Sequence, residues 1–114
     1  MISKRFSAAV VVSNARSSAR WFKEKLGFQT SAHGHWVTVW PRGSTAKLHL
    51  CEGKPERGNT GVGFYTQDVE RDAKKLKARR VKFTKEPVDE GWGTYAMFSD
   101  KDGNIYWLIE GSGP

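Results

Sequence analysis

Two side chains that could act as a base, a nucleophile or a metal ligand lie two residues apart in this sequence. They are His49 and Cys51, within a stretch that alternates between apolar and polar residues. Alternation places both on one face of a β-strand, where they could hold a divalent cation together with a third donor. Alternatively, His49 could act as a general base, with Cys51 or Tyr65 as the acid. A strand histidine is more often a neutral, hydrogen-bonded residue, so this spacing alone does not establish catalysis.

Aromatic residues form a second group with a chemical use. Trp36, Trp40, Tyr65, Tyr95 and Trp107 lie in alternating segments, in the phase opposite to the aliphatic residues. In a sheet that packs one face on helices, that phase lines the open face. Rings with a few polar groups among them are typical of a small-molecule pocket, and each aromatic pair adds roughly 0.5–1.5 kcal/mol. The alternative is that these rings fill the concave side of the sheet or form a dimer interface.

The predicted ligand-binding residues share this open face, except for one tryptophan that adjoins it. Trp92 lies between Gly91 and Gly93, just ahead of a strand, and could close over a ligand as a mobile lid. The full predicted set is Trp36, Thr38, Trp40, His49, Tyr65, Trp92, Tyr95, Met97 and Trp107.

The elements that position these residues follow the same order twice. Asn14 is a good helix N-cap, and Gly27 can end the helix that follows. Asp68 is the corresponding N-cap in the second half. The pattern predicts strands at 6–13, 28–31, 36–40 and 47–51 in the first half, and at 61–66, 81–84 and two more in the segment 91–110 in the second.

The last two strands form a hairpin around the segment from Asp100 to Asn104. Gly103 can adopt the positive φ that a tight turn requires. Acidic residues at alternate positions here suggest calcium, but an EF-hand loop needs Gly at its sixth position and Glu at its twelfth. Those positions hold Ile105 and Gly111, so we interpret the segment as a structural turn.

The composition describes one protein domain with a strong positive charge. The 114 residues carry a formal charge of +7, which would suit an acidic partner. Eight of the nineteen basic residues lie between Arg71 and Lys85, mostly on a predicted helix. This pattern favours a solvated helix face over a nucleic-acid footprint. No apolar run approaches the length of a membrane span, the run at 8–12 is too short for a secretory signal, and the lone Cys51 fits a reducing cytoplasm.

Several motifs resemble those of the vicinal oxygen chelate superfamily, which includes glyoxalase I, extradiol dioxygenases, and fosfomycin- and bleomycin-resistance proteins. The C-terminal signature is Trp-Gly, then Phe-x-Asp-x-Asp-Gly-Asn, then a strand ending in Leu-x-Glu. The resemblance implies an α+β fold of two βαβββ modules that form a curved mixed sheet around a cavity. The single domain 1–114 would contain module one at about 5–53, a linker at 54–60 and module two at about 61–110. The matching segments are 12–14, 21–22, 26–28, 68–69, 92–93, 98–104 and 108–110.

Two features bear on this fold expectation. Relatives usually have Gly at the position of Arg80, so this arginine must either adopt a left-handed conformation or end the helix differently. The alternative fold is a single ferredoxin-like βαββαβ sheet, as in RNA-recognition modules, which would leave two predicted strands unaccounted for.

The resemblance also implies four positions for metal ligands. Metal-dependent relatives place a His or Glu on each of four strands, and these positions correspond here to Ser7, His49, Gly61 and Trp107. Only His49 coordinates well, and one imidazole does not hold a catalytic metal against water. We therefore expect no metal or other cofactor, with His49 as a weak candidate ligand.

The function expected from these observations is metal-independent binding or sequestration of a small, partly aromatic molecule. The chain is closest in character to the bleomycin-resistance branch, and that resemblance implies a homodimer. A neutral or anionic ligand suits the basic chain better than a cationic one. One alternative is a metal-dependent lyase or dioxygenase of the glyoxalase type, and a second is nucleic-acid binding through the basic residues at 71–85.

Overall fold

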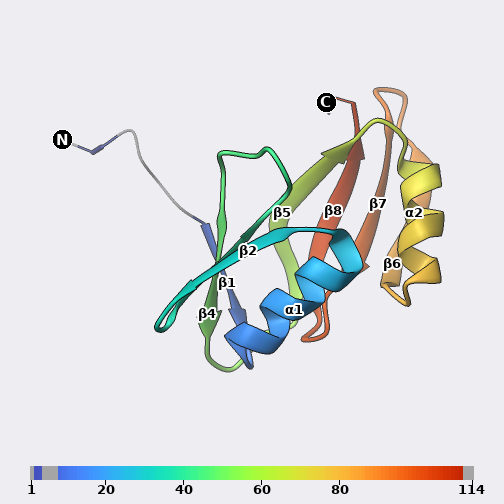
Figure 1. Cartoon of the computed structure of the whole chain (residues 1–114). Helices are drawn as coiled ribbons and strands as arrows, with labels where there is room; N and C mark the ends of the chain where they lie inside the picture. The colour runs from blue at the N-terminus through green and yellow to red at the C-terminus, as the bar shows by residue number, and fades with distance from the viewer. Residues whose placement is uncertain (1, 4–7, 112–114) are drawn as a thin grey trace. The chain divides into compact units, whose positions relative to one another are not determined.

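The computed structural model describes residues 2–3 and 8–111 of the chain. The chain divides into two compact units, Met1–Pro55 (unit 1) and Glu56–Pro114 (unit 2). Each unit contains one helix and one four-stranded mixed sheet (Figure 1). The predicted α+β class is confirmed, and the single-sheet ferredoxin-like alternative is wrong, because all eight strands are used in two sheets.

Unit 1 has the strand order β1-β4-β3-β2, in which β1 pairs parallel with β4 and the other neighbours pair antiparallel. Helix α1 packs against β2, β3 and β4. The buried strand residues are the aliphatic phase that the sequence predicts, for example Val37, Val39 and Leu50. The elements are β1 (Ala8–Val12), α1 (Ala15–Leu26), β2 (Gln29–His33), β3 (Trp36–Trp40) and β4 (Leu48–Glu52).

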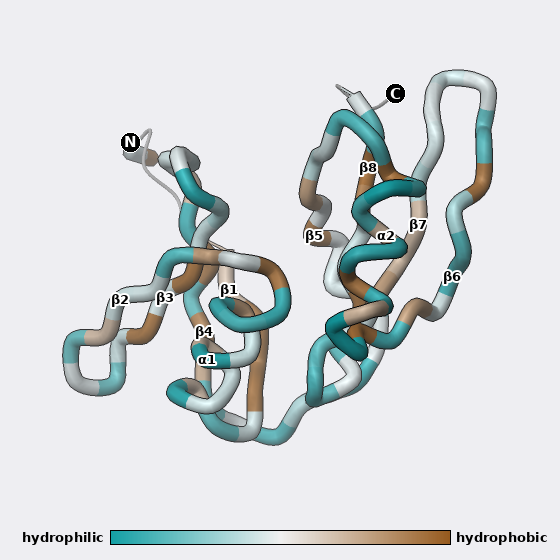
Figure 2. The backbone as a smooth tube through the Cα atoms, turned by 45° about the vertical axis from the view of Figure 1, so that its right-hand side comes forward, coloured by the Kyte–Doolittle hydropathy of each residue, from teal (hydrophilic) through white to brown (hydrophobic). Residues whose placement is uncertain are grey.

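Unit 2 repeats this arrangement with the strand order β5-β8-β7-β6 and the same parallel pair, β5 with β8. Helix α2 packs against β6, β7 and β8, and most of its residues are hydrophilic (Figure 2). Two strands are longer than predicted. β5 begins three residues before the predicted strand, inside the expected linker, and β6 continues five residues beyond its predicted end. The elements are β5 (Gly58–Thr66), α2 (Val69–Ala78), β6 (Lys82–Asp89), β7 (Thr94–Ser99) and β8 (Asn104–Glu110).

Both helices begin with the same double cap. The Asn14 side chain accepts a hydrogen bond from the Ser17 amide at 2.9 Å, and the Glu52 carboxylate accepts one from the Ala15 amide at 2.9 Å. In unit 2 the Arg71 amide donates to Asp68 at 3.0 Å, and the Val69 amide donates to Glu110 at 3.0 Å. Free N–H groups at a helix start require such acceptors. The final Glu of each unit's last strand is therefore explained as a helix cap.

The two helices end differently. Gly27 adopts a left-handed φ of 72° after α1, as predicted. Arg80 takes the corresponding role after α2 with a φ of 66°, and the Val81 amide donates back to Leu76 O at 3.0 Å. Of the two conformations considered for Arg80, the chain therefore adopts the left-handed one, at a cost of roughly 1 kcal/mol relative to glycine.

The turn between β7 and β8 is built around one buried carboxylate. Asp100 Oδ2 accepts hydrogen bonds from the Tyr106 hydroxyl at 2.8 Å and the Asn104 side-chain amide at 3.0 Å. Its Oδ1 accepts from the backbone amides of Asp102 and Asn104. Burial, and after it the charge of Asp100, raises the pKa of the Tyr106 phenol. These contacts explain the acidic segment as a structural turn.

Candidate ligand-binding site

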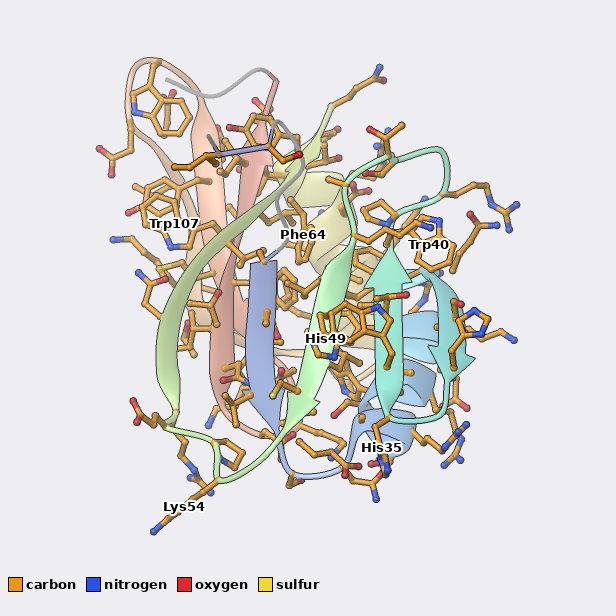
Figure 3. All side chains as sticks on the ribbon, turned by 90° about the vertical axis from the view of Figure 1, so that its left-hand side faces the viewer. His35, Trp40, His49, Lys54, Phe64 and Trp107 are labelled. Atoms are coloured by element: carbon orange, nitrogen blue, oxygen red, sulfur yellow. The ribbon has the colours of Figure 1, made fainter. Side chains whose placement is uncertain are left out.

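In unit 1, an indole and an imidazole stack on the open face of the sheet. Trp36 and His49 have ring centroids 3.8 Å apart and planes 20° apart. They come from the adjacent antiparallel strands β3 and β4, where Thr38 pairs with His49. Trp36 remains 53% exposed, so its outer face is accessible. His49 is the second residue of β4, and Figure 3 shows its side chain on that strand.

Trp40 lies at the other end of β3 and is held by two polar neighbours. Its indole N–H donates to Gln29 Oε1 at 3.1 Å, and Lys47 Nζ lies 4.4 Å from its ring centroid. Thr38 is half-buried between the two tryptophans on the same phase of the strand. The structure therefore places all four predicted unit 1 residues along β3 and β4, but only Trp36 and His49 form a ring pair.

A cavity of ≈740 Å³ lies at the Trp36 end of β3. Trp36 and His49 are the two predicted ligand residues in its wall, and His35 and Arg16 were not predicted there. His35 belongs to the tight turn between β2 and β3 (Figure 3). The complete lining is Asn14, Ala15, Arg16, Gly34, His35, Trp36, Val37, His49, Cys51 and Glu52.

Unit 2 carries three rings in series. Trp92 stacks on Tyr95 with centroids 6.2 Å apart, and Tyr95 stacks on Trp107 with centroids 5.4 Å apart. Met97 lies beside them, because it pairs directly with Trp107 across β7 and β8. Trp92 is 41% exposed, and Tyr65 on β5 is 58% exposed. Tyr65 makes no ring contact with the three stacked residues in the part of the chain that the structure describes.

Two polar residues that the sequence did not indicate hold this stack. Asn59 Oδ1 accepts a hydrogen bond from the Trp107 indole N–H at 3.1 Å. Lys85 Nζ lies 5.2 Å from the Tyr95 ring centroid. A hydrogen bond with Tyr95 and the charge of that phenol raise the pKa of the Lys85 ammonium, so it remains cationic at neutral pH. Both residues were missed because β5 and β6 extend beyond their predicted bounds.

The two ring pairs occupy equivalent positions in the two units. Counting back from the capping glutamates Glu52 and Glu110, His49 corresponds to Trp107. Trp36 corresponds to Tyr95, since each lies two residues before the residue that pairs with its stacking partner, Thr38 for His49 and Met97 for Trp107. The fold therefore presents an aromatic pair at the same place twice.

The four positions that the resemblance assigned to metal ligands offer few donors. Ser7 lies outside the described residues. His49 is stacked by Trp36, and Trp107 presents an indole. Gly61 has no side chain and a φ of 75°. Within residues 2–3 and 8–111, no group of three or more His, Cys, Asp or Glu residues could hold a metal ion.

Two cations of the basic segment at 71–85 form ion pairs. Arg71 pairs with Asp72 at 3.1 Å, and Lys77 pairs with Glu86. These ion pairs agree with the predicted solvated helix face.

Comparisons with known proteins agree with this architecture. The model of the Glyoxalase/Bleomycin resistance protein/Dioxygenase superfamily matches residues 5–108. The chain therefore belongs to this superfamily, as the sequence motifs predicted. No helix among the described residues is long and apolar enough to cross a membrane.

Individual relatives match nearly the whole chain. A superfamily member from Sphaerobacter thermophilus is 31% identical with a TM-score of 0.85, covering 96% of this chain and 98% of its own. TnmS3, an antibiotic binding protein from Streptomyces sp. CB03234, is 28% identical with a TM-score of 0.76, covering 98% and 100%. The uncharacterized protein YetH of Bacillus subtilis is 28% identical, covering 96% of this chain and 100% of its own.

Proposed function

We propose that this protein binds and sequesters a small, partly aromatic molecule, without a metal and without catalysing a reaction. The observation that carries the proposal is the stacked series Trp92, Tyr95 and Trp107, whose outermost ring, Trp92, is 41% exposed and accessible to a ligand. Planar ligands gain roughly 0.5–1.5 kcal/mol per well-made ring contact beyond the burial of their area. The similarity to TnmS3, an antibiotic binding protein, supports this class of function.

The charges beside the rings favour a neutral or anionic ligand. Lys85 lies over Tyr95, and Lys47 lies over Trp40. In either unit, a cationic ligand at the rings would be repelled by the neighbouring ammonium group, whereas a carboxylate or phenolate would be attracted. Members of this superfamily bind small molecules and often form dimers, so we also propose a homodimer, which sedimentation analysis would test.

A thermal-shift screen with aromatic antibiotics, thiols and divalent cations tests the proposed function. Because a ligand that binds only the folded state stabilises it, an aromatic hit at one hundred times its Kd should raise the Tm by roughly 10 °C. Substituting Trp107→Ala should remove most of that shift. Trp21→Phe is the matched control, since Trp21 lies on α1 in edge contact with Phe22.

Two results would contradict the proposal. One is a panel in which a divalent cation raises the Tm and no aromatic compound does. The other is metal analysis of untagged protein that finds one tightly held divalent ion per chain or per dimer.

A further inference from the structure

The positive charge of the protein is concentrated in one of its two units. Residues 1–55 contain nine Lys and Arg against two Asp and Glu, whereas residues 56–114 contain ten of each. The formal charge of +7 therefore belongs to unit 1. The cluster at 71–85, which is prominent in the sequence, lies in the unit with no net charge.

Part of the unit 1 charge forms a stripe along α1. Arg16, Arg20 and Lys23 follow each other at spacings of four and three, which puts them on one side of the helix over about 10 Å. The first turn of α1 contains no acidic residue. Neither Arg20 nor Lys23 has a carboxylate partner among residues 2–3 and 8–111.

The same three cations line a groove between α1 and β2, the edge strand of the unit 1 sheet. Its volume is ≈370 Å³. The small Ala19 leaves room between the long cationic side chains, and Thr30 and Ser31 contribute residues with hydroxyl groups on the strand side. The complete lining is Arg16, Ala19, Arg20, Lys23, Thr30, Ser31, Ala32 and Val37.

This groove adjoins the larger cavity beside Trp36. Arg16 and Val37 line both, and the Arg16 guanidinium donates to Gly34 O at 3.4 Å in the turn between β2 and β3. The groove and the larger cavity are therefore contiguous at the end of β3 that carries Trp36. Glu52 lies in the larger cavity, where its carboxylate accepts from the Ala15 amide, so an anionic group is favoured in the groove instead.

We infer that unit 1 binds a phosphorylated aromatic molecule of the chemical class of nucleotides, with its phosphates in the α1–β2 groove and its planar part against Trp36. Arginine forks match phosphate oxygens in a bidentate manner, and three cations in a row suit a ligand with more than one phosphate charge. Contact with Trp36 rests on the proposed function, whereas phosphate binding in the groove does not.

Titration calorimetry with three probes separates these parts. Adenosine diphosphate, adenosine and inorganic pyrophosphate are each titrated at 50 mM and 300 mM salt. We expect the diphosphate to bind at least about tenfold more tightly than adenosine at low salt, and to weaken at high salt. The double variant Arg20→Gln/Lys23→Gln should weaken the diphosphate and pyrophosphate by at least about tenfold.

Lys74→Gln/Lys75→Gln is the matched control, because it removes the same charge from the exposed face of α2. The control should leave all affinities unchanged. Trp36→Ala should weaken adenosine diphosphate and leave pyrophosphate unchanged, and circular dichroism verifies the fold of each variant. If Trp36→Ala left the affinity for adenosine diphosphate unchanged while the other expected results held, the ring contact would be contradicted and the phosphate site would remain supported.

Three results would overturn the inference. The first is an equal affinity for adenosine and adenosine diphosphate. The second is a loss of diphosphate affinity in the α2 control as large as that in the α1 double variant. The third is no binding of adenosine diphosphate at 50 mM salt. A single-stranded oligonucleotide that displaces the diphosphate and binds at least about tenfold more tightly would replace the nucleotide with nucleic acid as the ligand.

Discussion

The two units have the same backbone plan and different surface chemistry. Each has the same strand order, an Asn or Asp cap, and a glutamate from its last strand on the first helical amide. Yet Arg16 occupies the second helical position in unit 1, and Glu70 occupies it in unit 2. Hydrogen bonds that satisfy the backbone are therefore common to both units, while the exposed charge is free to reverse sign.

The interiors of the units differ at their last turn, and this difference should have the largest effect on stability. Asp100→Ala would remove the acceptor of four hydrogen bonds. Their donors are the backbone amides of Asp102 and Asn104, the Asn104 side-chain amide and the Tyr106 hydroxyl. We expect a loss of about 3 kcal/mol or more in the free energy of unfolding, measured with urea.

The control lies in the corresponding turn of unit 1, where the Ser44 hydroxyl is hydrogen-bonded to the backbone of Ala46 at an exposed site. Ser44→Ala should cost less than about 0.5 kcal/mol. Similar losses at both turns would contradict the view that unit 2 depends on its buried carboxylate.

A second prediction concerns alkaline pH. The pKa of Tyr106 is higher in the folded state than in the unfolded state. The neutral phenol therefore makes its full contribution to the free energy of unfolding below about pH 10, and this contribution is lost as the pH rises further. Tyr106→Phe should cost about 1–2 kcal/mol at pH 7. It should also flatten the decline in stability between about pH 10 and pH 12.

Chemical unfolding at a series of pH values measures this effect. Leu48 occupies the unit 1 position that corresponds to Tyr106, so unit 1 has no equivalent buried phenol there. An alkaline decline as steep in the variant as in the parent protein would show that other groups control it.

The helix ends give the smallest expected effects, in opposite directions. Gly27→Ala should destabilise by about 1 kcal/mol, because an alanine side chain disfavours a φ of 72°. Arg80→Gly should stabilise by roughly 0.5–1 kcal/mol, because it removes that cost at the equivalent position. Urea midpoints with unchanged m-values would measure both. A loss of stability in Arg80→Gly would indicate that the arginine side chain contributes contacts that outweigh its backbone strain.

Local patterns predicted the fold accurately where one rule acted alone. The bounds of α1, its cap at Asn14 and its end at Gly27 agree with the structure, as does the alternation that buries Val37 and Val39. Strand β6 was predicted to end at residue 84, whereas it continues to Asp89. The structure shows two irregularities in the pairing of β6 with β7, which keep Lys85 within the sheet.

The candidate site was harder to predict because it depends on the register of strand pairing and on contacts between residues that are distant in the sequence. Ile109 lies on the same alternating phase of β8 as Trp107, yet it is only 7% exposed. A Cβ at Gly63 would lie 2.8 Å from its Cδ1 atom, so the bare backbone of Gly63 makes room for it. The Arg16 and His35 side chains enter a common cavity because the turn between β2 and β3 lies near the start of α1. No spacing in the sequence encodes that proximity.

The left-handed backbone at Gly61 limits how this protein could evolve new chemistry. The family resemblance matches residue 61 to a metal-ligand position of metal-dependent relatives, and a histidine or glutamate placed there would have to adopt a φ of 75°. Arg80 shows that a non-glycine residue can adopt such a backbone, at a cost of roughly 1 kcal/mol. A chelating side chain at residue 61 would therefore start with that loss of stability before it made any bond to a metal.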